Sequence, residues 1–246
     1  MGGVIQMKIA IFTIVKDEKI MLPKWINYYK KQCDKLLILD NDTTDGSTDN
    51  IEYEVRKVTC GKAFNHDWLK NIVMKTQKEL LKTYDYVVFA EVDEFIMHKN
   101  KPLKQAILEA NLDKIRCEGY NIIQLENEKD LDWDKPLLEQ RSNWSRFTQM
   151  DKTLISKNPL EWVVGFHHAK GETTINKGWY LIHLHTIDKE YAWNKTLLRS
   201  KYDWNKKDKD KGLGQHNHIS NKEIFNKWYN IFKDTGKIIP ELRGKL

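Results

Sequence analysis

Three carboxylates within four residues follow an apolar segment of the chain. The segment 86–90 (YVVFA) is short, β-branched and aromatic, which predicts a buried strand. Glu91, Asp93 and Glu94 come directly after it, where ligands bind in open α/β sheets. Such close carboxylates repel one another unless a positive charge lies among them. A divalent cation, Mg²⁺ or Mn²⁺, is the simplest candidate, because hard cations bind carboxylate oxygens. The alternative is a strand end that is acidic without binding anything.

The rest of the chain supplies the strands and helices that would position these acids. Short apolar, β-branched runs predict strands, and segments with one apolar face predict helices. Their alternation predicts an α/β fold with a mostly parallel sheet and helices on both faces. No linker or repeat interrupts the chain, so we predict one domain over residues 1–246, with a nucleotide-binding half (about 7–125) and a less regular acceptor-side half (about 126–246). The predicted strands are residues 8–15, 34–40, 55–58, 84–90, 120–125, 153–155, 162–164 and 180–185, and the predicted helices are residues 20–31, 64–82, 102–110, 192–202 and 221–233.

The composition limits the class of partner. The 246 residues include 41 lysines and arginines against 35 acids, a formal net charge of +6. This mild excess suits a nucleotide or an acidic membrane surface, and with the latter a peripheral membrane association. The lysines are spread along the chain rather than clustered, which argues against a nucleic acid as partner. The nine tryptophans and ten tyrosines suit core packing as well as stacking on sugars or bases.

The cysteines and the hydropathy pattern indicate a compartment. Cys33, Cys60 and Cys117 are widely separated, which predicts free thiols in a reducing environment. The chain has no apolar run of 18 residues, so we expect no transmembrane helix. Its beginning does not have the pattern of a signal peptide, and Met7 could itself be a start. These features together predict a cytoplasmic protein.

Four motifs, taken in their order, resemble a glycosyltransferase of the GT-A type, in its family-2-like branch. Residues 13–18 (TIVKDE) are similar to that branch's "VKNE" start. Residues 39–41 and 44–48 (LDN and TDGST) are similar to its strand-end loop, and residues 86–95 (YVVFAEVDEF) to its "D-x-D-E-F" metal motif. Late histidines stand near the places of its "G-x-H" and "H-Y" elements. The resemblance covers about residues 7–202.

This resemblance implies a Rossmann-like GT-A fold and a nucleotide-sugar donor, most simply a uridine-linked one. It also implies a glycan or glycolipid acceptor and inversion at the transferred sugar. Glu91 stands where the family usually has Asp, and Asp93 stands at the position of the family's usual direct metal ligand. The longer side chain of Glu91 could reach a ribose hydroxyl or a metal-bound water.

Candidate donor-binding residues lie at the ends of the predicted strands and in the second half. The first strand exit offers backbone groups and carboxylates, and Asp40 is placed to accept from a uracil-like N–H or a ribose hydroxyl. A basic side chain should meet the phosphates. Helix capping and turn formation are the alternatives for Asp17 and Asp40, and a solvated surface is the alternative for the basic residues. The candidates are Thr13, Val15, Asp17, Asp40, Glu91, Lys152 and Arg199.

The metal ligands follow from the acidic motif and the late histidines. His183 and His185 are two apart on a predicted strand, so both face one side. The alternative for such a pair is one core and one surface histidine. With the resemblance, we predict Asp93 and His185 as ligands of the metal or the diphosphate, with His168 in the same site. His216 and His218 lie in a polar segment and are expected on a surface loop.

An inverting transfer needs a general base, usually a carboxylate near the acceptor. Acids that follow the predicted strand 120–125 are eligible, and a solvated loop is the alternative for most of them. The candidate bases are Glu126, Asp132 and Asp134.

Two other functions compete with glycosyl transfer. A nucleotidyltransferase can use a related sheet and a metal-binding acid pair, but it normally begins with a glycine-rich basic loop, which residues 15–18 (VKDE) lack. A catalytically inactive protein that binds a sugar or nucleotide is favoured only by Glu91 in place of Asp.

Overall fold

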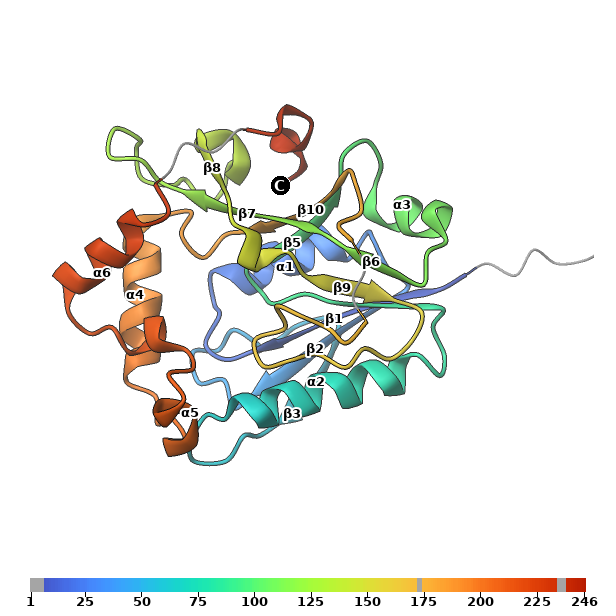
Figure 1. Ribbon diagram of the computed structural model, residues 1–246, viewed down its shortest axis with the longest axis horizontal. Coiled ribbons are helices and arrows are strands. Elements are labelled where there is room, and N and C mark those ends of the chain that lie inside the picture. The colour runs from blue at the N-terminus through green and yellow to red at the C-terminus, as the bar shows by residue number, and fades with distance from the viewer. Residues whose placement is uncertain (1–6, 172–173, 234–237) are drawn as a thin grey trace, which may run out of the picture.

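The computed structural model describes residues 7–171, 174–233 and 238–246. Two β-sheets share one hydrophobic core, and helices flank them (Figure 1). The predicted α/β class, a mostly parallel sheet flanked by helices, is confirmed.

The larger sheet has six strands in the order β3-β2-β1-β4-β9-β6. The pairs β3–β2, β2–β1 and β1–β4 are parallel, whereas β9 runs antiparallel to β4 and to β6. The carboxyl ends of β1, β2 and β4 therefore meet at one edge of the sheet. The strands are β1 (Ile9–Val15), β2 (Lys35–Asn41), β3 (Glu54–Val58), β4 (Tyr86–Phe89), β6 (Lys114–Arg116) and β9 (Thr153–Ser156).

The smaller sheet has four strands in the order β5-β10-β7-β8. Its strands are β5 (Glu94–His98), β7 (Glu118–Ile123), β8 (Asn143–Arg146) and β10 (Trp179–His183). Because β4 belongs to the first sheet and β5 to the second, residues 90–93 form a crossover between the sheets. Three carboxylates, at positions 91, 93 and 94, lie at this junction, which we call the acidic crossover.

The helices cover both sheets. The described helices are α1 (Met21–Tyr29), α2 (His66–Leu80), α3 (Leu103–Ala110), α4 (Lys189–Ser200), α5 (Lys206–Asp210) and α6 (Lys222–Asn230). In α1, the hydroxyl of Tyr29 accepts from the amide of Ile96 at 2.8 Å and donates to the carbonyl of Glu94 at 3.1 Å. This helix therefore holds β5 and the acidic crossover in register. In Figure 1, α4 and α6 lie side by side at one end of the molecule.

Most predicted elements are confirmed, with ends that shift by a few residues. The prediction of a strand at 162–164 is wrong, because only an isolated bridge between Trp162 and Ala169 forms there. The sequence did not reveal β5, β6, β8 and α5. Strand β8 reads as polar (NWSR), but it pairs with β7, and its Asn143 and Ser145 are buried.

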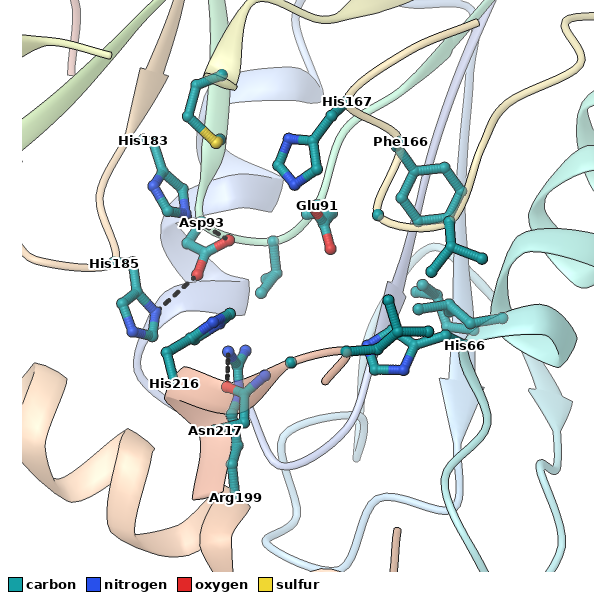
Figure 2. A pocket seen from close by; sticks show the side chains of 18 of the residues that line it. His66, Glu91, Asp93, Phe166, His167, His183, His185, Arg199, His216 and Asn217 are labelled. Atoms are coloured by element: carbon teal, nitrogen blue, oxygen red, sulfur yellow. Dashed lines mark hydrogen bonds and ion pairs between the residues drawn. The ribbon is translucent and has the colours of Figure 1, made fainter. Parts of the chain in front are cut away.

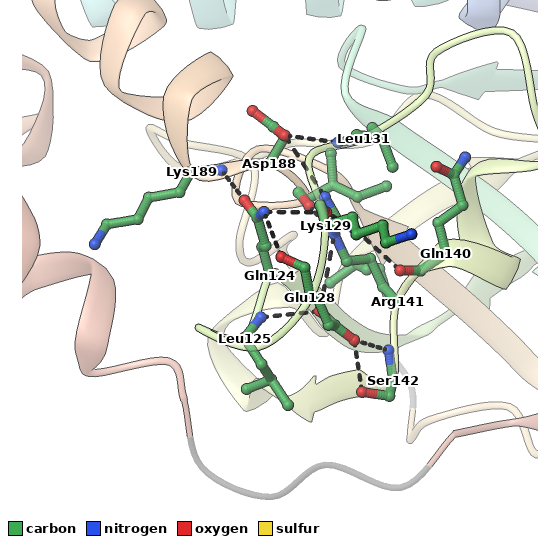
Figure 3. A network of polar contacts seen from close by, with 12 residues as sticks. Gln124, Leu125, Glu128, Lys129, Leu131, Gln140, Arg141, Ser142, Asp188 and Lys189 are labelled. Atoms are coloured by element: carbon green, nitrogen blue, oxygen red, sulfur yellow. Dashed lines mark hydrogen bonds and ion pairs between the residues drawn. The ribbon is translucent and has the colours of Figure 1, made fainter.

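A polar network fixes the loop after β7 to the start of α4 (Figure 3). The buried guanidinium of Arg141 donates to the carbonyls of Ile187 and Lys129. Its Nη2 lies 3.6 Å from the carboxylate of Asp188. Asp188 in turn caps α4 by accepting from the amide of Tyr191 at 2.8 Å, the usual role of an N-cap aspartate. The network therefore sets where the side chains of α4 point.

None of the described helices is both long and apolar enough to cross a membrane.

We predict that Gly119→Ala destabilises the fold. A Cβ at Gly119 in β7 would lie 2.4 Å from the Cβ and 2.5 Å from the carbonyl carbon of Met150. Because backbone atoms cannot step aside, overpacking should lower the free energy of unfolding by roughly 1–3 kcal/mol, measured by urea denaturation. Gly244→Ala is the control, since its Cβ would meet only Glu139 at 3.7 Å. Equal stability of the two variants would contradict this account.

Candidate active site

A cavity of about 480 Å³ opens at the carboxyl ends of β1, β2 and β4. This is the place where ligands bind in open α/β sheets. The loop 164–167, the end of β10, α4, α6 and the segment 213–217 close it from the second half of the chain. The charged and histidine side chains that line it are Lys16, Glu18, His66, Glu91, Asp93, Lys152, His167, His183, His185, Arg199 and His216.

A buried lysine contacts two acids of the crossover. The ammonium of Lys152 lies 2.9 Å from Oε2 of Glu91 and 2.6 Å from Oε1 of Glu94. The Lys152 side chain is 1% exposed, whereas that of Glu91 is 38% exposed and reaches the cavity. Burial and the neighbouring Glu91 raise the pKa of Glu94 despite Lys152. Lys152 therefore holds Glu91 at the wall of the cavity.

A second buried lysine neutralises Asp93. The ammonium of Lys195 in α4 lies 3.1 Å from Oδ2 of Asp93 and 2.9 Å from Oε1 of Glu18. Burial by itself raises the pKa of Asp93, but Lys195 and the adjacent histidines hold it well below its usual range. Asp93 is therefore a carboxylate at neutral pH.

Two histidines face Asp93 with parallel rings, 5.8 Å apart (Figure 2). Nδ1 of His183 lies 2.7 Å from Oδ1 of Asn121, which assigns the proton to Nδ1. Its Nε2 lies 3.8 Å from Oδ1 of Asp93. Nδ1 of His185 lies 3.5 Å from Oδ2 of Asp93, and its buried Nε2 has no hydrogen-bond partner among the described residues. Burial lowers the pKa of His183 to about 3 and that of His185 to about 4, so both are neutral at pH 7.

A strained loop presents a third histidine. Gly165 and Phe166 both have left-handed backbones, with φ of +83° and +60°. A left-handed phenylalanine is rare and is found where a structure needs a particular geometry. His167 follows, and its Nδ1 lies 2.6 Å from the carbonyl oxygen of Gln149. The carbonyl can only accept, so Nδ1 carries the proton and Nε2 is an acceptor. In Figure 2, His167 and Glu91 lie on the same side of the cavity.

The opposite side of the cavity is basic and aromatic. The ammonium of Lys16 lies 3.1 Å from the carbonyl oxygen of Asp42 and 5.4 Å from the ring centre of Tyr202. The ring of Trp204 packs on Phe64 at 4.7 Å. Arg199 lies 3.3 Å from Glu18 and remains 26% exposed. Cations beside flat apolar rings suit a phosphorylated ligand with an aromatic base.

The structure brings together six of the residues predicted for the site and leaves seven outside the lining of the cavity. Val15, Glu91, Asp93, Lys152, His185 and Arg199 line the cavity. Those outside are Thr13, Asp17, Asp40, Glu126, Asp132, Asp134 and His168, all within the described part of the chain.

The strand-end residues outside the cavity hold loops. Asp40 accepts from the amide of Thr43 and the hydroxyl of Thr48, and it pairs with Lys57 at 2.8 Å. Asp17 accepts from the amide of Thr44. The contact with Thr43 matches the turn-forming alternative for Asp40, whereas Asp17 ties the end of β1 to the loop after β2. Thr13 is fully buried within β1.

The three candidate bases lie on the surface. The side chain of Glu126 is 84% exposed and pairs with Lys233 at 2.9 Å. Asp132 pairs with Lys135, and the side chain of Asp134 is fully exposed. None of these three carboxylates lines the cavity, so a carboxylate that acts there must be a different residue.

The three predicted metal ligands do not come together. His168 is exposed, away from Asp93 and His185. Oδ2 of Asp93 is already bonded to Lys195. Within the described residues, no group of three His, Cys, Asp or Glu side chains converges on a position for a metal ion. The described side chains therefore do not form a metal centre by themselves. Because Mg²⁺ is usually held by one or two carboxylates together with substrate phosphates, Mn²⁺ or Mg²⁺ stays a prediction from the sequence.

Several residues of the site were not predicted. His216 was expected on a surface loop, and its side chain is exposed, but it also lines the cavity and stacks on Trp228 with ring centres 5.9 Å apart. His167 carried a signal in its Gly-Phe-His context. Lys195 carried none, because a lysine within a polar helix normally reads as solvated.

No protein-family model matches the chain, and no curated protein sequence matches it. Among solved structures, the chain is similar to one from Bacillus anthracis, provisionally described as a glucose-1-phosphate thymidylyltransferase and crystallised with a sucrose. The identity is 10%, the match covers 95% of this chain and 87% of the other, and the TM-score is 0.32. A likeness at this level carries no argument about activity.

We predict that Gly165→Ala displaces His167. The position has a φ of +83°, and an added Cβ would lie 2.9 Å from Cδ2 of His167. A side chain in this conformation costs about 1–2 kcal/mol, and the imidazole must move. The NMR signals of the His167 ring should differ between the variant and the unmodified protein, while those of His66, across the cavity, should not. Unchanged His167 signals would mean that Gly165 does not set its position.

Proposed function

We propose that this protein is a glycosyltransferase that moves a sugar from a nucleotide-sugar donor, a uridine-linked one in the simplest case, to a hydroxyl of a glycan or glycolipid. The observation that carries the proposal is one cavity, at the carboxyl ends of parallel strands, that joins an aromatic and basic side to an acidic side. A nucleotide sugar has the matching parts: an aromatic base, an anionic diphosphate and a neutral polyhydroxyl sugar. The motifs that resemble GT-A enzymes supply the acidic side.

The donor is oriented by these two sides. The base and ribose lie against Phe64 and Asn41, beyond the ends of β2 and β3. The diphosphate meets Lys16 and Arg199, whose charges strengthen hydrogen bonds to phosphate oxygens. The sugar then extends toward Glu91, whose carboxylate accepts from its hydroxyls.

The transfer breaks one bond and forms another. The bond from the anomeric carbon to the diphosphate oxygen breaks, and its electron pair stays on the diphosphate. The acceptor oxygen forms the new bond to the anomeric carbon, and its proton passes to a base. Lys16 and Arg199 stabilise the charge that grows on the leaving group, which is where fixed cations contribute most.

The base is a residue of the cavity wall. Nε2 of His167 is an unprotonated acceptor, and Glu91 is a carboxylate partly open to the cavity. Glu91 is paired with Lys152. This ammonium holds the pKa of Glu91 below the ordinary value, although burial alone raises it. Burial also lowers the pKa of His167, but an imidazole has a higher ordinary pKa than a carboxylate, so His167 is the better candidate.

A binding panel tests the nucleotide. Thermal unfolding should shift upward with one nucleoside diphosphate among uridine, guanosine, cytidine and thymidine diphosphates, because a ligand that binds only the folded state stabilises it. Donor hydrolysis should then be detected with the sugar nucleotide of that base. Binding without any turnover would instead support the inactive binding protein, and no shift with any nucleotide would remove the proposal.

Two matched variants test the base. His167→Asn keeps a donor near Gln149 but removes the acceptor Nε2, and it should lower kcat by about a hundredfold or more. Donor affinity should stay nearly unchanged. Glu91→Gln should mainly weaken donor binding. If Glu91→Gln abolishes turnover while His167→Asn does not, the roles are reversed.

A further inference from the structure

Every carboxylate at the acidic crossover is already paired with a cation of the protein. Lys152 lies within 2.9 Å of both Glu91 and Glu94. Lys195 lies within 3.1 Å of both Glu18 and Asp93. The positive charge beside these acids therefore comes from two lysines of the protein.

These lysines are built into the fold rather than attracted from the surface. The side chains of Lys152 and Lys195 are only 1% and 6% exposed. Lys195 also contacts the hydroxyl of Tyr191 one turn earlier in α4, at 3.3 Å. The start of α4 is fixed by the cap at Asp188 and the network around Arg141. A charge held in this way needs no reorganisation when a ligand arrives.

Lys195 limits the capacity of Asp93 for a divalent ion. Oδ2 of Asp93 is bonded to Lys195, whereas Oδ1 lies 3.8 Å from the unprotonated Nε2 of His183 and makes no hydrogen bond with it. An ion on Oδ1 would share a single carboxylate charge with the Lys195 ammonium, so two positive centres would face each other in a buried site.

Two further cations remain available to an anion in the cavity. The hydrogen bonds of the Lys16 ammonium go to two backbone carbonyl oxygens, at 3.1 and 3.3 Å. The guanidinium of Arg199 makes two long contacts with described residues, 3.3 Å to Glu18 and 3.4 Å to Asn217, and it is part-exposed at the wall. Both can turn toward phosphate oxygens without leaving Glu18 unpaired, because Lys195 stays bonded to Glu18.

We propose that the donor diphosphate is bound by the protein's own cations, Lys16 and Arg199, and that Lys195 and Lys152 take the charge-balancing place of a divalent metal. This inference rests on the proposed function. It states that the nucleoside diphosphate binds, and later leaves, without Mg²⁺ or Mn²⁺. Lys195 and Lys152 act as positioning residues, because they hold the acids rather than the ligand.

Isothermal titration calorimetry of uridine diphosphate tests the inference, with the guanosine, cytidine and thymidine diphosphates in parallel. Each is titrated into the full chain in excess EDTA and again with saturating MnCl₂. The dissociation constants in the two buffers should agree within about threefold, a difference below 1 kcal/mol. Hydrolysis of the matching sugar nucleotide should persist in EDTA.

The outcomes separate the two proposals. Binding that appears only with MnCl₂ overturns the metal-free site but leaves the nucleotide function standing. Binding in neither buffer removes the proposed function, and this inference with it.

Variants of single lysines make the test sharper. Lys195→Met should weaken nucleotide binding in EDTA by about tenfold or more, and MnCl₂ should restore part of it, because an ion can now balance Asp93. Lys195→Arg keeps the charge and should bind in EDTA. Lys170→Met is the control, since Lys170 is a surface residue paired with Glu161. Unchanged binding by Lys195→Met in EDTA would contradict the role of this lysine.

A second variant covers the case in which Lys195→Met does not fold. Lys16→Met leaves no buried carboxylate unpaired, because the hydrogen bonds of Lys16 go to backbone carbonyls. It should fold, weaken nucleotide binding by about tenfold and stay insensitive to MnCl₂. Full recovery of affinity with MnCl₂ would show that a metal, and not Lys16, neutralises the phosphates.

Discussion

The pairing of buried carboxylates with buried lysines at the acidic crossover is the interaction on which the site depends. An isolated carboxylate in this position would be strongly destabilising, and a buried pair is tolerated only when each charge has its partner. The partners come from far along the chain: Lys152 is 61 residues from Glu91, and Lys195 is 102 residues from Asp93. The first half of the chain therefore cannot form this site alone.

Both sheets contribute to this charge pairing. Strand β4 ends in the first sheet and β5 begins the second, so the crossover lies where both sheets and α1 meet. Lys152 directly precedes β9 of the first sheet, His183 ends β10 of the second sheet, and Lys195 lies in α4. The cap at Asp188 and the network around Arg141 position α4 so that its Lys195 reaches Asp93. Packing, capping and charge pairing thus converge on one short segment.

The sequence predicts what local patterns encode. Apolar runs located β1, β2 and β4, and the acids after β4 located one wall of the cavity. It could not predict what depends on side-chain direction after a turn. Asp40 ends a strand yet turns back to Thr43 and Thr48, and Glu126 follows a strand yet points to solvent. Lys195 reads as a solvated helix residue, because burial of a lysine is decided by acids that lie a hundred positions away.

A cation supplied by a side chain differs physically from a cation supplied by an ion. A metal is gained with the ligand and lost with it, and its affinity depends on its concentration. A buried lysine is placed when the chain folds, so the desolvation of its charge is offset by folding rather than by ligand binding. Nearby carboxylates raise the pKa of Lys195 although burial alone lowers it, so the ammonium persists throughout the physiological range. The electrostatic field that meets an entering anion is then a property of the fold. The left-handed backbones of Gly165 and Phe166 place His167 in that field when the chain folds.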